Sequence, residues 1–321
     1  MVDSNQDAQF FYDETTTLLR RFGGAVSEID PRLKPPHVDE IFVSAEWKPA
    51  DGFFARVRAF RRIERDRIAA VNTGVPFSAY QPRSVLDPGP DGRAGTADDR
   101  MLTVFEQDPA TFGQDHFLLT NPSGLRMDQR GMVAEAGFNK RGVSAQGSLY
   151  VGKSWGPTNP GNDIWENDSG VVGSLYADPN TMLFASGRPT LDRSFAAKAW
   201  VSFSTGRRLG TFDVINTAVV TGGYPYARRL LVSGLAQGPF MVDASPRGGP
   251  QGDTTDPVYD WSLRISRTFR GRLRISAEVF NLLNLGASMR VADLTGPQFL
   301  QNVPLEVQPP RFVRGGISWE F

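Results

Sequence analysis

The last nine residues, Val313 to Phe321 (VRGGISWEF), carry the pattern that decides the fold. With a period of two, one side of this stretch holds Val, Gly, Ile, Trp and Phe, and the other holds Arg, Gly, Ser and Glu. Trp319 and Phe321 therefore stand at the end of the apolar side. After several similar strands, such an ending predicts the last strand of a transmembrane β-barrel, with lipid on its apolar side and the lumen on its polar side.

The composition agrees with an all-β chain and excludes some other classes. The 321 residues carry 35 basic and 35 acidic side chains, so no overall field favours nucleic acid as a partner. Mean hydropathy is −0.31, and no stretch approaches the roughly 18 apolar residues of a transmembrane helix. The 33 glycines and 23 prolines indicate many turns and long connections.

Earlier stretches alternate in the same way and are predicted as antiparallel strands. Most have about 9 to 11 residues, the length that crosses a bilayer with tilt. The predicted hairpins are 38–47 with 53–62, 130–138 with 143–151, 195–203 with 211–221, and 259–269 with 272–280, followed by the strand 312–321.

The connections alternate in length. Short polar turns alternate with four long segments, 63–129, 152–194, 222–258 and 281–311, which show no clear structure of their own. Such loops are uncommon inside a compact soluble domain. They are expected of an outer-membrane barrel, which has short periplasmic turns and long extracellular loops.

Several stretches, in order along the chain, resemble the distal barrel of TonB-dependent receptors. They are Ala134–Ser154 (AEAGFNKRGVSAQGSLYVGKS), Tyr224–Arg228 (YPYAR), Ala277–Asn284 (AEVFNLLN) and Arg311–Phe321 (RFVRGGISWEF). Pro36–Glu46 (PHVDEIFVSAE) and Asp87–Asp99 (DPGPDGRAGTADD) resemble the Oar-like branch, whose members carry a carboxypeptidase-regulatory-like domain.

The resemblance implies a barrel of 22 strands with a plugged lumen. About ten strand candidates are present, so residues 1–321 are expected to be the carboxy-terminal part of such a barrel, without the signal peptide, the plug domain and the first strands. Met1 to Asp7 accordingly shows no signal-peptide pattern.

The resemblance also implies a function. The whole receptor would take up an unknown ligand across the outer membrane, with energy from the TonB system through the missing amino-terminal parts. The chain alone is expected neither to transport nor to act as an enzyme. Its expected partners are outer-membrane lipid and the barrel assembly machinery, which would recognise Trp319 and Phe321.

Two other readings stay open. The chain could form a complete small outer-membrane barrel that acts as a pore or an enzyme. It could also form a soluble β-sandwich that binds carbohydrate, because a sandwich gives the same alternation with its apolar side inward.

One acidic loop is a candidate calcium site. Asp87, Asp91, Asp98 and Asp99 place four carboxylates in thirteen residues, and glycines between them permit tight turns. Calcium prefers six to eight oxygen ligands. The loop lacks the EF-hand spacing, and its aspartates could instead form Asx turns in a solvated loop.

Other charged residues are expected to be structural. Arg56, Arg58 and Arg62 alternate along one predicted strand, and Arg264, Arg272 and Arg274 lie near the end of the chain. They could contact a plug or an anionic ligand, but ordinary lining of a polar lumen is the simpler interpretation. His37 and His116, the two histidines, show no catalytic pattern.

Deleting Phe321 from a full-length parent receptor is expected to lower its insertion into the outer membrane, because the assembly machinery would lose its terminal aromatic signal. Heat-modifiable migration in gels and surface exposure on cells measure insertion. Unchanged values of both would contradict the assignment.

Overall fold

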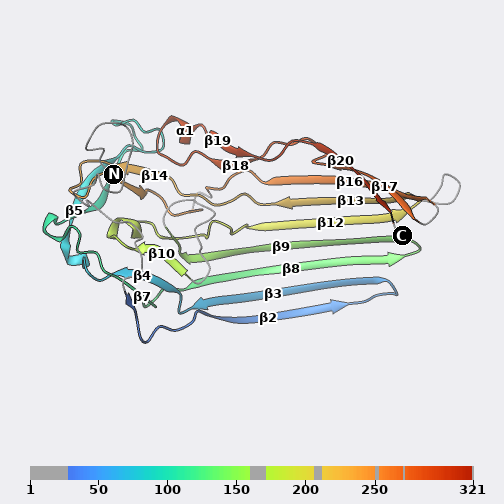
Figure 1. Ribbon diagram of the computed structural model, residues 1–321, viewed down its shortest axis with the longest axis horizontal. Coiled ribbons are helices and arrows are strands. Elements are labelled where there is room, and N and C mark those ends of the chain that lie inside the picture. Colours follow the sequence, from blue (N-terminus) through green and yellow to red (C-terminus); the bar gives the residue numbers. More distant parts are fainter. Residues whose placement is uncertain (1–27, 160–170, 206–211, 250–252, 270–271, 320–321) are drawn as a thin grey trace.

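The fold is dominated by one large antiparallel sheet. The computed structural model describes residues 28–159, 171–205, 212–249, 253–269 and 272–319. Within these ranges nine long strands pair in chain order as a meander, which we call the main sheet (Figure 1). They are β2 (His37–Trp47), β3 (Phe53–Arg65), β8 (Met127–Lys140), β9 (Val143–Pro157), β12 (Phe195–Ser204), β13 (Phe212–Thr221), β16 (Val258–Phe269), β17 (Leu273–Phe280) and β20 (Phe312–Trp319).

The all-β, antiparallel prediction is confirmed, and each predicted strand coincides with a strand of the main sheet. The largest differences are in β8 and β9, which run longer than the alternation indicated. The turn between them shrinks to Arg141 and Gly142, with φ of 54° and 78°. Two successive positive φ values define a type I′ turn, whose twist matches that of the flanking strands.

The prediction that the long connections lack structure is wrong. In the described residues they form several small sheets of their own. One sheet has the order β1 (Glu28–Ile29), β7 (Phe117–Thr120), β4 (Ile68–Asn72) and β10 (Val171–Tyr176). Two-stranded sheets join β5 (Tyr80–Asp87) to β6 (Arg100–Gln107), β14 (Arg229–Val232) to β15 (Phe240–Asp243), and β18 (Ser288–Val291) to β19 (Pro304–Val307).

Short elements complete these connections. They are β11 (Ser186–Gly187), which pairs with β9, the 3₁₀-helices η1 (Phe77–Ala79), η2 (Pro109–Thr111) and η3 (Pro179–Met182), and the single helical turn α1 (Pro297–Leu300). Many of these strands have only four or five residues, too few for alternation to distinguish a strand from a loop.

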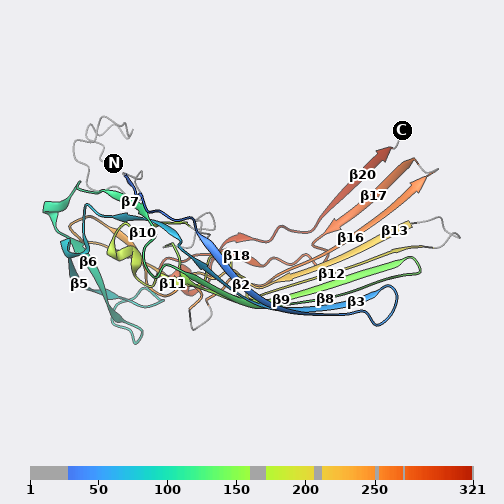
Figure 2. The same ribbon diagram turned by 90° about the horizontal axis from the view of Figure 1, so that it is seen from below.

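All the long connections gather at one end of the main sheet, and the short turns lie at the other (Figure 1). Figure 2 shows the main sheet curving from β3 to β20, with the small sheets beside its left end. We call the described residues of 66–126, 158–194, 222–257 and 281–311 the cap.

The hydrophobic core lies in the cap. Val104 and Val242 have exposed fractions of 0% and 1%, and they pack in one cluster with Leu102, Leu230, Val232, Leu235, Phe240 and Ala244. Among the described residues, Met127 is the one buried apolar side chain on a main-sheet strand. The cap is thus stabilised as a soluble domain is, whereas the main sheet keeps its apolar side chains at its surface.

Leu102→Ala is expected to destabilise the cap by about 2–5 kcal/mol, because it opens a cavity in this cluster. Met101 precedes it on β6 and is 62% exposed, so Met101→Ala is the matched control and should change stability little. Limited proteolysis across a urea series measures the difference. Equal cleavage of the two variants would place the core elsewhere.

Candidate functional site

The register of the main sheet gives it two chemically different faces. One cross-strand row consists of Trp47, Ala55, Ala136, Gly147, Ala199, Ala218 and Trp261. The row one residue away consists of Glu46, Arg56, Glu135, Ser148, Lys198, Val219 and Asp260. We call the face of the first row the apolar face and that of the second the polar face.

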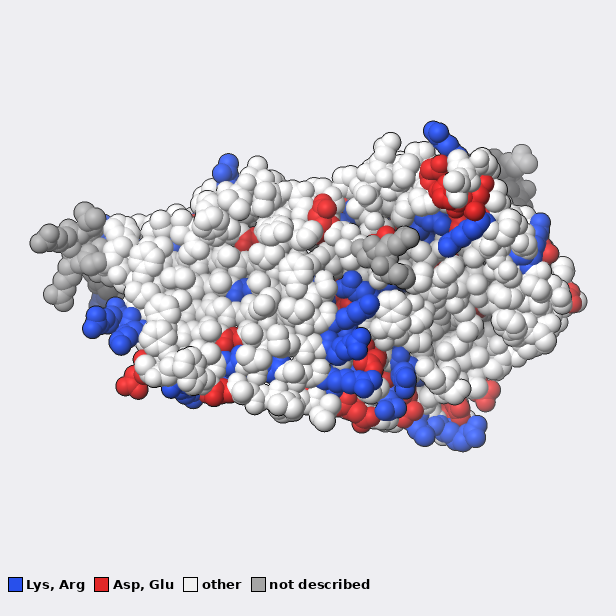
Figure 3. Space-filling model, turned by 180° about the vertical axis from the view of Figure 1, so that it is seen from behind, with Lys and Arg blue, Asp and Glu red and all other residues white. Residues whose placement is uncertain are grey.

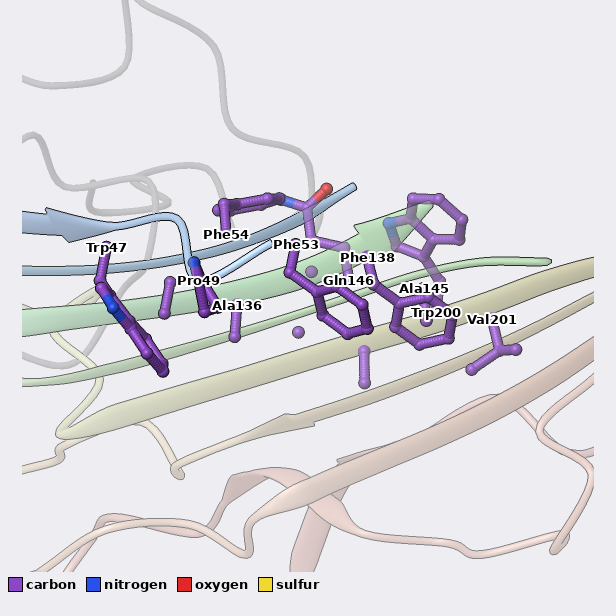
Figure 4. Close-up of a pocket in the computed structure, with 14 residues that line it drawn as sticks. Trp47, Pro49, Phe53, Phe54, Ala136, Phe138, Ala145, Gln146, Trp200 and Val201 are labelled. Atoms are coloured by element: carbon purple, nitrogen blue, oxygen red, sulfur yellow. The ribbon is translucent and has the colours of Figure 1, made fainter. Parts of the chain in front are cut away.

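The apolar face carries a shallow groove near the short turns. Small side chains at Ala55, Ala136 and Gly147 form its floor, since they stand opposite one another on neighbouring strands. Figure 4 shows the rings of Phe53 and Phe138 on the groove side of the sheet. Phe54, Gln146 and Trp200 extend from the opposite side, as strand alternation requires (Figure 4).

Aromatic side chains line the end of the apolar face beside the short turns. This aromatic row consists of Trp47, Phe53, Phe138, Phe203, Phe212, Phe269 and Trp319, each at or near the end of its strand. Phe53 and Phe138 stack with ring centroids 5.5 Å apart. Trp319 is 55% exposed in this row, whereas Phe321 lies outside the described residues.

The polar face is lined by ion pairs between strands. Arg56 donates to Glu46 from Nε (3.0 Å) and Nη2 (2.7 Å), and its Nη1 lies 3.7 Å from Glu135. On the same face Arg62 donates to Glu40 at 2.6 Å, and Arg314 donates to Glu278 at 2.5 Å. Exposed pairs of this kind add little stability each. Their effect is to give this face a hydrophilic surface that is close to neutral.

Most of the arginines that the sequence predicted to line a polar lumen lie on this face. Arg56, Arg58 and Arg62 share it, and the Arg58 guanidinium lies 4.0 Å from the Phe42 ring centroid. Arg264 and Arg274 lie on the polar face of β16 and β17, and Arg272 is in the turn before β17. Their acidic and aromatic neighbours agree with a lining role.

A buried charge cluster holds the cap together. The carboxylate of Asp87, with an exposed fraction of 0%, accepts from both Nη atoms of Arg228 (2.7 and 2.6 Å) and from Nε of Arg100 (2.8 Å). Arg228 also donates to Oγ1 of Thr295 at 2.7 Å. The cluster therefore joins the β5–β6 pair to two later connections.

The arginines control the ionisation of this carboxyl group. Burial by itself raises the pKa of Asp87, but the hydrogen bonds and charges of Arg228 and Arg100 outweigh burial, so its pKa is below the ordinary value. Asp87 therefore stays ionised in the folded cap.

The YPYAR stretch, which carried part of the family resemblance, has a structural role in the cap. The Arg193 guanidinium lies 3.7 Å from the ring centroid of Tyr224, and Tyr226 packs edge-on against Phe299 at 6.2 Å. Arg228 is the residue in the Asp87 cluster. The sequence of this stretch does not reveal its partners, because Arg193 and Phe299 lie more than thirty residues away along the chain.

The acidic loop has local partners in place of a metal ion. Asp91 accepts from the Arg93 amide at 2.8 Å, Asp98 from Oγ1 of Thr96 at 2.7 Å, and Asp99 from the Gly95 amide at 2.6 Å. Among the described residues, no three His, Cys, Asp or Glu side chains are placed to hold a metal ion. Calcium binding by Asp87, Asp91, Asp98 and Asp99 stays a prediction, with Asp87 engaged by arginines.

The histidines form exposed pairs. Nδ1 of His37 lies 3.3 Å from Asp66, and Nε2 of His116 lies 3.3 Å from Glu28. Each lies at the cap end of the molecule, where neither is part of a larger constellation.

Comparison with known structures shows a shared fold. The siderophore receptor PirA from Acinetobacter baumannii matches over 90% of this chain and 32% of its own, with 12% identity and a TM-score of 0.51. The FrpB iron transporter from Neisseria meningitidis (12% identity, 92% of this chain, 33% of its own) has a TM-score of 0.48. The ferripyoverdine receptor of the outer membrane of Pseudomonas aeruginosa matches over 90% of this chain and 28% of its own, with 12% identity and a TM-score of 0.47.

The chain thus spans about a third of the length of the receptors that it matches. At 12% identity, the similarity to PirA shows the fold alone. No family model and no curated protein matches the sequence, so the Oar-like assignment stays a prediction. No helix among the described residues is long and apolar enough to cross a membrane.

Asp87→Asn is expected to destabilise the cap by about 3 kcal/mol or more at neutral pH, because Arg228 stays buried without its counter-charge. Since the pKa of Asp87 is lowered on folding, its contribution is present above about pH 4 and is lost as pH falls through the lowered value. Thermal unfolding across an acid pH series measures this contribution. The unfolding temperature of the variant should change less with pH than that of the native chain.

Asp98→Asn removes an exposed carboxylate from the same loop and is the control. It should keep both the stability and the acid dependence of the native cap. A native pH profile in Asp87→Asn would show that the cluster does not stabilise the cap.

Proposed function

We propose that this chain forms part of the wall and the extracellular cap of a TonB-dependent receptor barrel in the outer membrane, a class that takes up ligands across that membrane. The observation that carries the proposal is the exposed apolar face of the main sheet, bordered by the aromatic row. The fold shared with PirA supports it.

The apolar face is too large and too exposed for a water-soluble monomer. Exposed fractions reach 71% at Ile41, 74% at Val43, 70% at Val313 and 78% at Ile317. No second sheet within the described ranges covers this face, as the inner face of a β-sandwich would be covered. Soluble monomers rarely leave contiguous apolar patches beyond a few hundred Å² exposed, so lipid is the partner that fits.

The height of the apolar face suits a bilayer. On β3, eight residues separate Phe53 in the aromatic row from Arg61, the first charged residue of the apolar face, and the residues of this face between them are apolar. At about 3.3 Å per residue this distance is roughly 26 Å along the strand. For a strand tilted by about 40° this corresponds to a height of about 20 Å, close to the apolar band of about 25 Å in outer-membrane barrels, whose borders carry aromatic girdles.

The two ends of the main sheet suggest the orientation. Outer-membrane barrels have short turns on the periplasmic side and long connections on the extracellular side. The turn at Arg141 and Gly142 would then be periplasmic, and the cap would be extracellular, where a receptor meets its ligand.

The edge strands suggest how the wall continues. Along the nine described strands of the meander, direction alternates, so β2 and β20 both run from the cap towards the short turns. They cannot pair antiparallel with each other, nor with the edges of a second copy inserted in the same orientation. A closed antiparallel wall therefore needs an odd number of further strands, as in a larger barrel of even strand number.

The remaining partners follow from the family resemblance. Gated uptake would require a plug and a TonB-contacting segment, and folding would require the barrel assembly machinery, with Trp319 in its recognition signal. A complete small barrel would have to supply its closing strands from residues outside the described ranges, so we favour the larger receptor.

Leu149→Arg tests the membrane assignment. Leu149 lies on the apolar face near the middle of β9, where an arginine facing lipid costs about 2–4 kcal/mol. Its neighbour Ser148 lies on the polar face, so Ser148→Arg is the matched control and should be tolerated. The fraction of chain that resists extraction from outer membranes measures insertion in both variants.

Two outcomes would contradict the proposal. Equal insertion of both variants would mean that the apolar face does not meet lipid. A wild-type chain that is monomeric in water without detergent would favour the soluble sandwich.

A further inference from the structure

Three cations stand opposite one another where the apolar face meets the cap. Arg61 on β3 pairs in register with Arg130 on β8, which pairs with Lys153 on β9. We call these residues the basic row. All three are exposed and belong to the apolar face, since they alternate with residues of the polar face. The adjoining row towards the short turns, Ala59, Met132 and Val151, is wholly apolar.

The basic row has an excess of positive charge. Asp128 is its one acidic partner among the described residues, and it accepts from the Arg61 guanidinium. Arg130 and Arg126 also interact electrostatically with Asp128. Within the described ranges, Arg130 and Lys153 form no ion pair, and Lys153 Nζ lies 4.7 Å from the ring centroid of Trp155. Figure 3 shows Lys and Arg atoms, with Asp and Glu atoms beside them, between the largely uncharged strand surface and the cap.

This arrangement is unfavourable without an anion. Like charges directly opposite each other on neighbouring strands destabilise a sheet. The polar face avoids this problem, because Arg56 stands between Glu46 and Glu135. In the basic row, by contrast, cation follows cation across three strands. An external anion that bridges them would remove the repulsion.

The position of the row identifies the anion. The row lies at one border of the apolar face, and the aromatic row lies at the other. A Trp beside a cation at such a border is typical of a membrane interface, where ring and charge meet headgroups. A ligand at this place presents acyl chains to Ala59, Met132 and Val151 and an anionic group to the cations, and these are the two parts of a phosphorylated lipid.

We propose that Arg61, Arg130 and Lys153 bind the phosphate groups of a lipid in the extracellular leaflet, with its acyl chains lying along the apolar face below them. The assignment of the leaflet rests on the proposed function. Lys and Arg near anionic headgroups each strengthen membrane binding. The site would hold the main sheet at a fixed height in the bilayer.

The test uses the full chain purified in neutral detergent, with bis-phosphorylated lipid A as the probe. Native mass spectrometry counts the lipid A molecules retained. Arg130→Gln with Lys153→Gln should lower retention about tenfold or more. Arg58→Gln with Lys198→Gln removes the same charge from the polar face and should retain lipid A as the native chain does. Arg130→Lys keeps the charge and should preserve binding.

Further measurements distinguish a lipid phosphate from free inorganic phosphate as the ligand. Dephosphorylated lipid A should bind as weakly as the double variant, and inorganic phosphate should not displace lipid A. Raised salt should weaken retention, because it screens exposed charges. Equal retention of the phosphorylated and dephosphorylated lipids, or full retention by the double variant, would overturn the proposal. Displacement by inorganic phosphate alone would show a phosphate site that is not specific for lipid.

Circular dichroism of each variant verifies that the strands persist, and Arg130→Lys gives an answer even where the double variant fails to fold. Failure of the proposed function gives a different result, because the wild-type chain would then be soluble without detergent. A chain that needs detergent but shows no preference for phosphate would overturn this inference alone.

Discussion

In lipid, a backbone N–H or C=O without a partner costs several kcal/mol, because no water is present to replace it. The main sheet meets this constraint, as its proposed place in a membrane requires. β20 pairs with β17 along its whole described length, from Phe312 to Trp319. Among the prolines that the structure describes, Pro157, at the last position of β9, is the one that falls within a main-sheet strand. A proline inside these strands would remove a ladder hydrogen bond, and apart from Pro157 the described prolines lie outside them.

The same constraint separates the two ways in which the chain uses apolar residues. In the cap, water surrounds the small sheets, so Val104 and Val242 turn inward and the hydrophobic effect stabilises the fold. Short strands, prolines and a buried ion cluster are tolerable there, because open backbone groups can meet water. In the main sheet the apolar side chains lie at the surface, and hydrogen bonds between the backbones of neighbouring strands hold the sheet together. The mean hydropathy of −0.31 is an average over the cap and the main sheet, so it does not reveal that they place their apolar residues differently.

How much could be predicted from the sequence depended on how local the determinants are. The strand Val258–Phe269 could be located by alternation, since each residue reports its own face. Asp87 could not be interpreted in the same way. The acidic loop indicated calcium because nearby carboxylates were visible, but Arg228, 141 positions later, neutralises Asp87. The basic row was missed for a similar reason: Arg61, Arg130 and Lys153 become neighbours only through the register.

The two borders of the apolar face differ chemically, and this difference gives the sheet a direction. Aromatic rings border the side of the short turns, where the Arg267 guanidinium lies 5.0 Å from the ring centroid of Phe212 and 4.7 Å from that of Phe269. Cations border the side of the cap, where β3, β8 and β9 carry them at one level. In the proposed outer-membrane setting, inverting the sheet would bring the cations to the opposite leaflet and carry the polar cap through the bilayer. On the proposed function, the cap and the basic row therefore favour the same orientation.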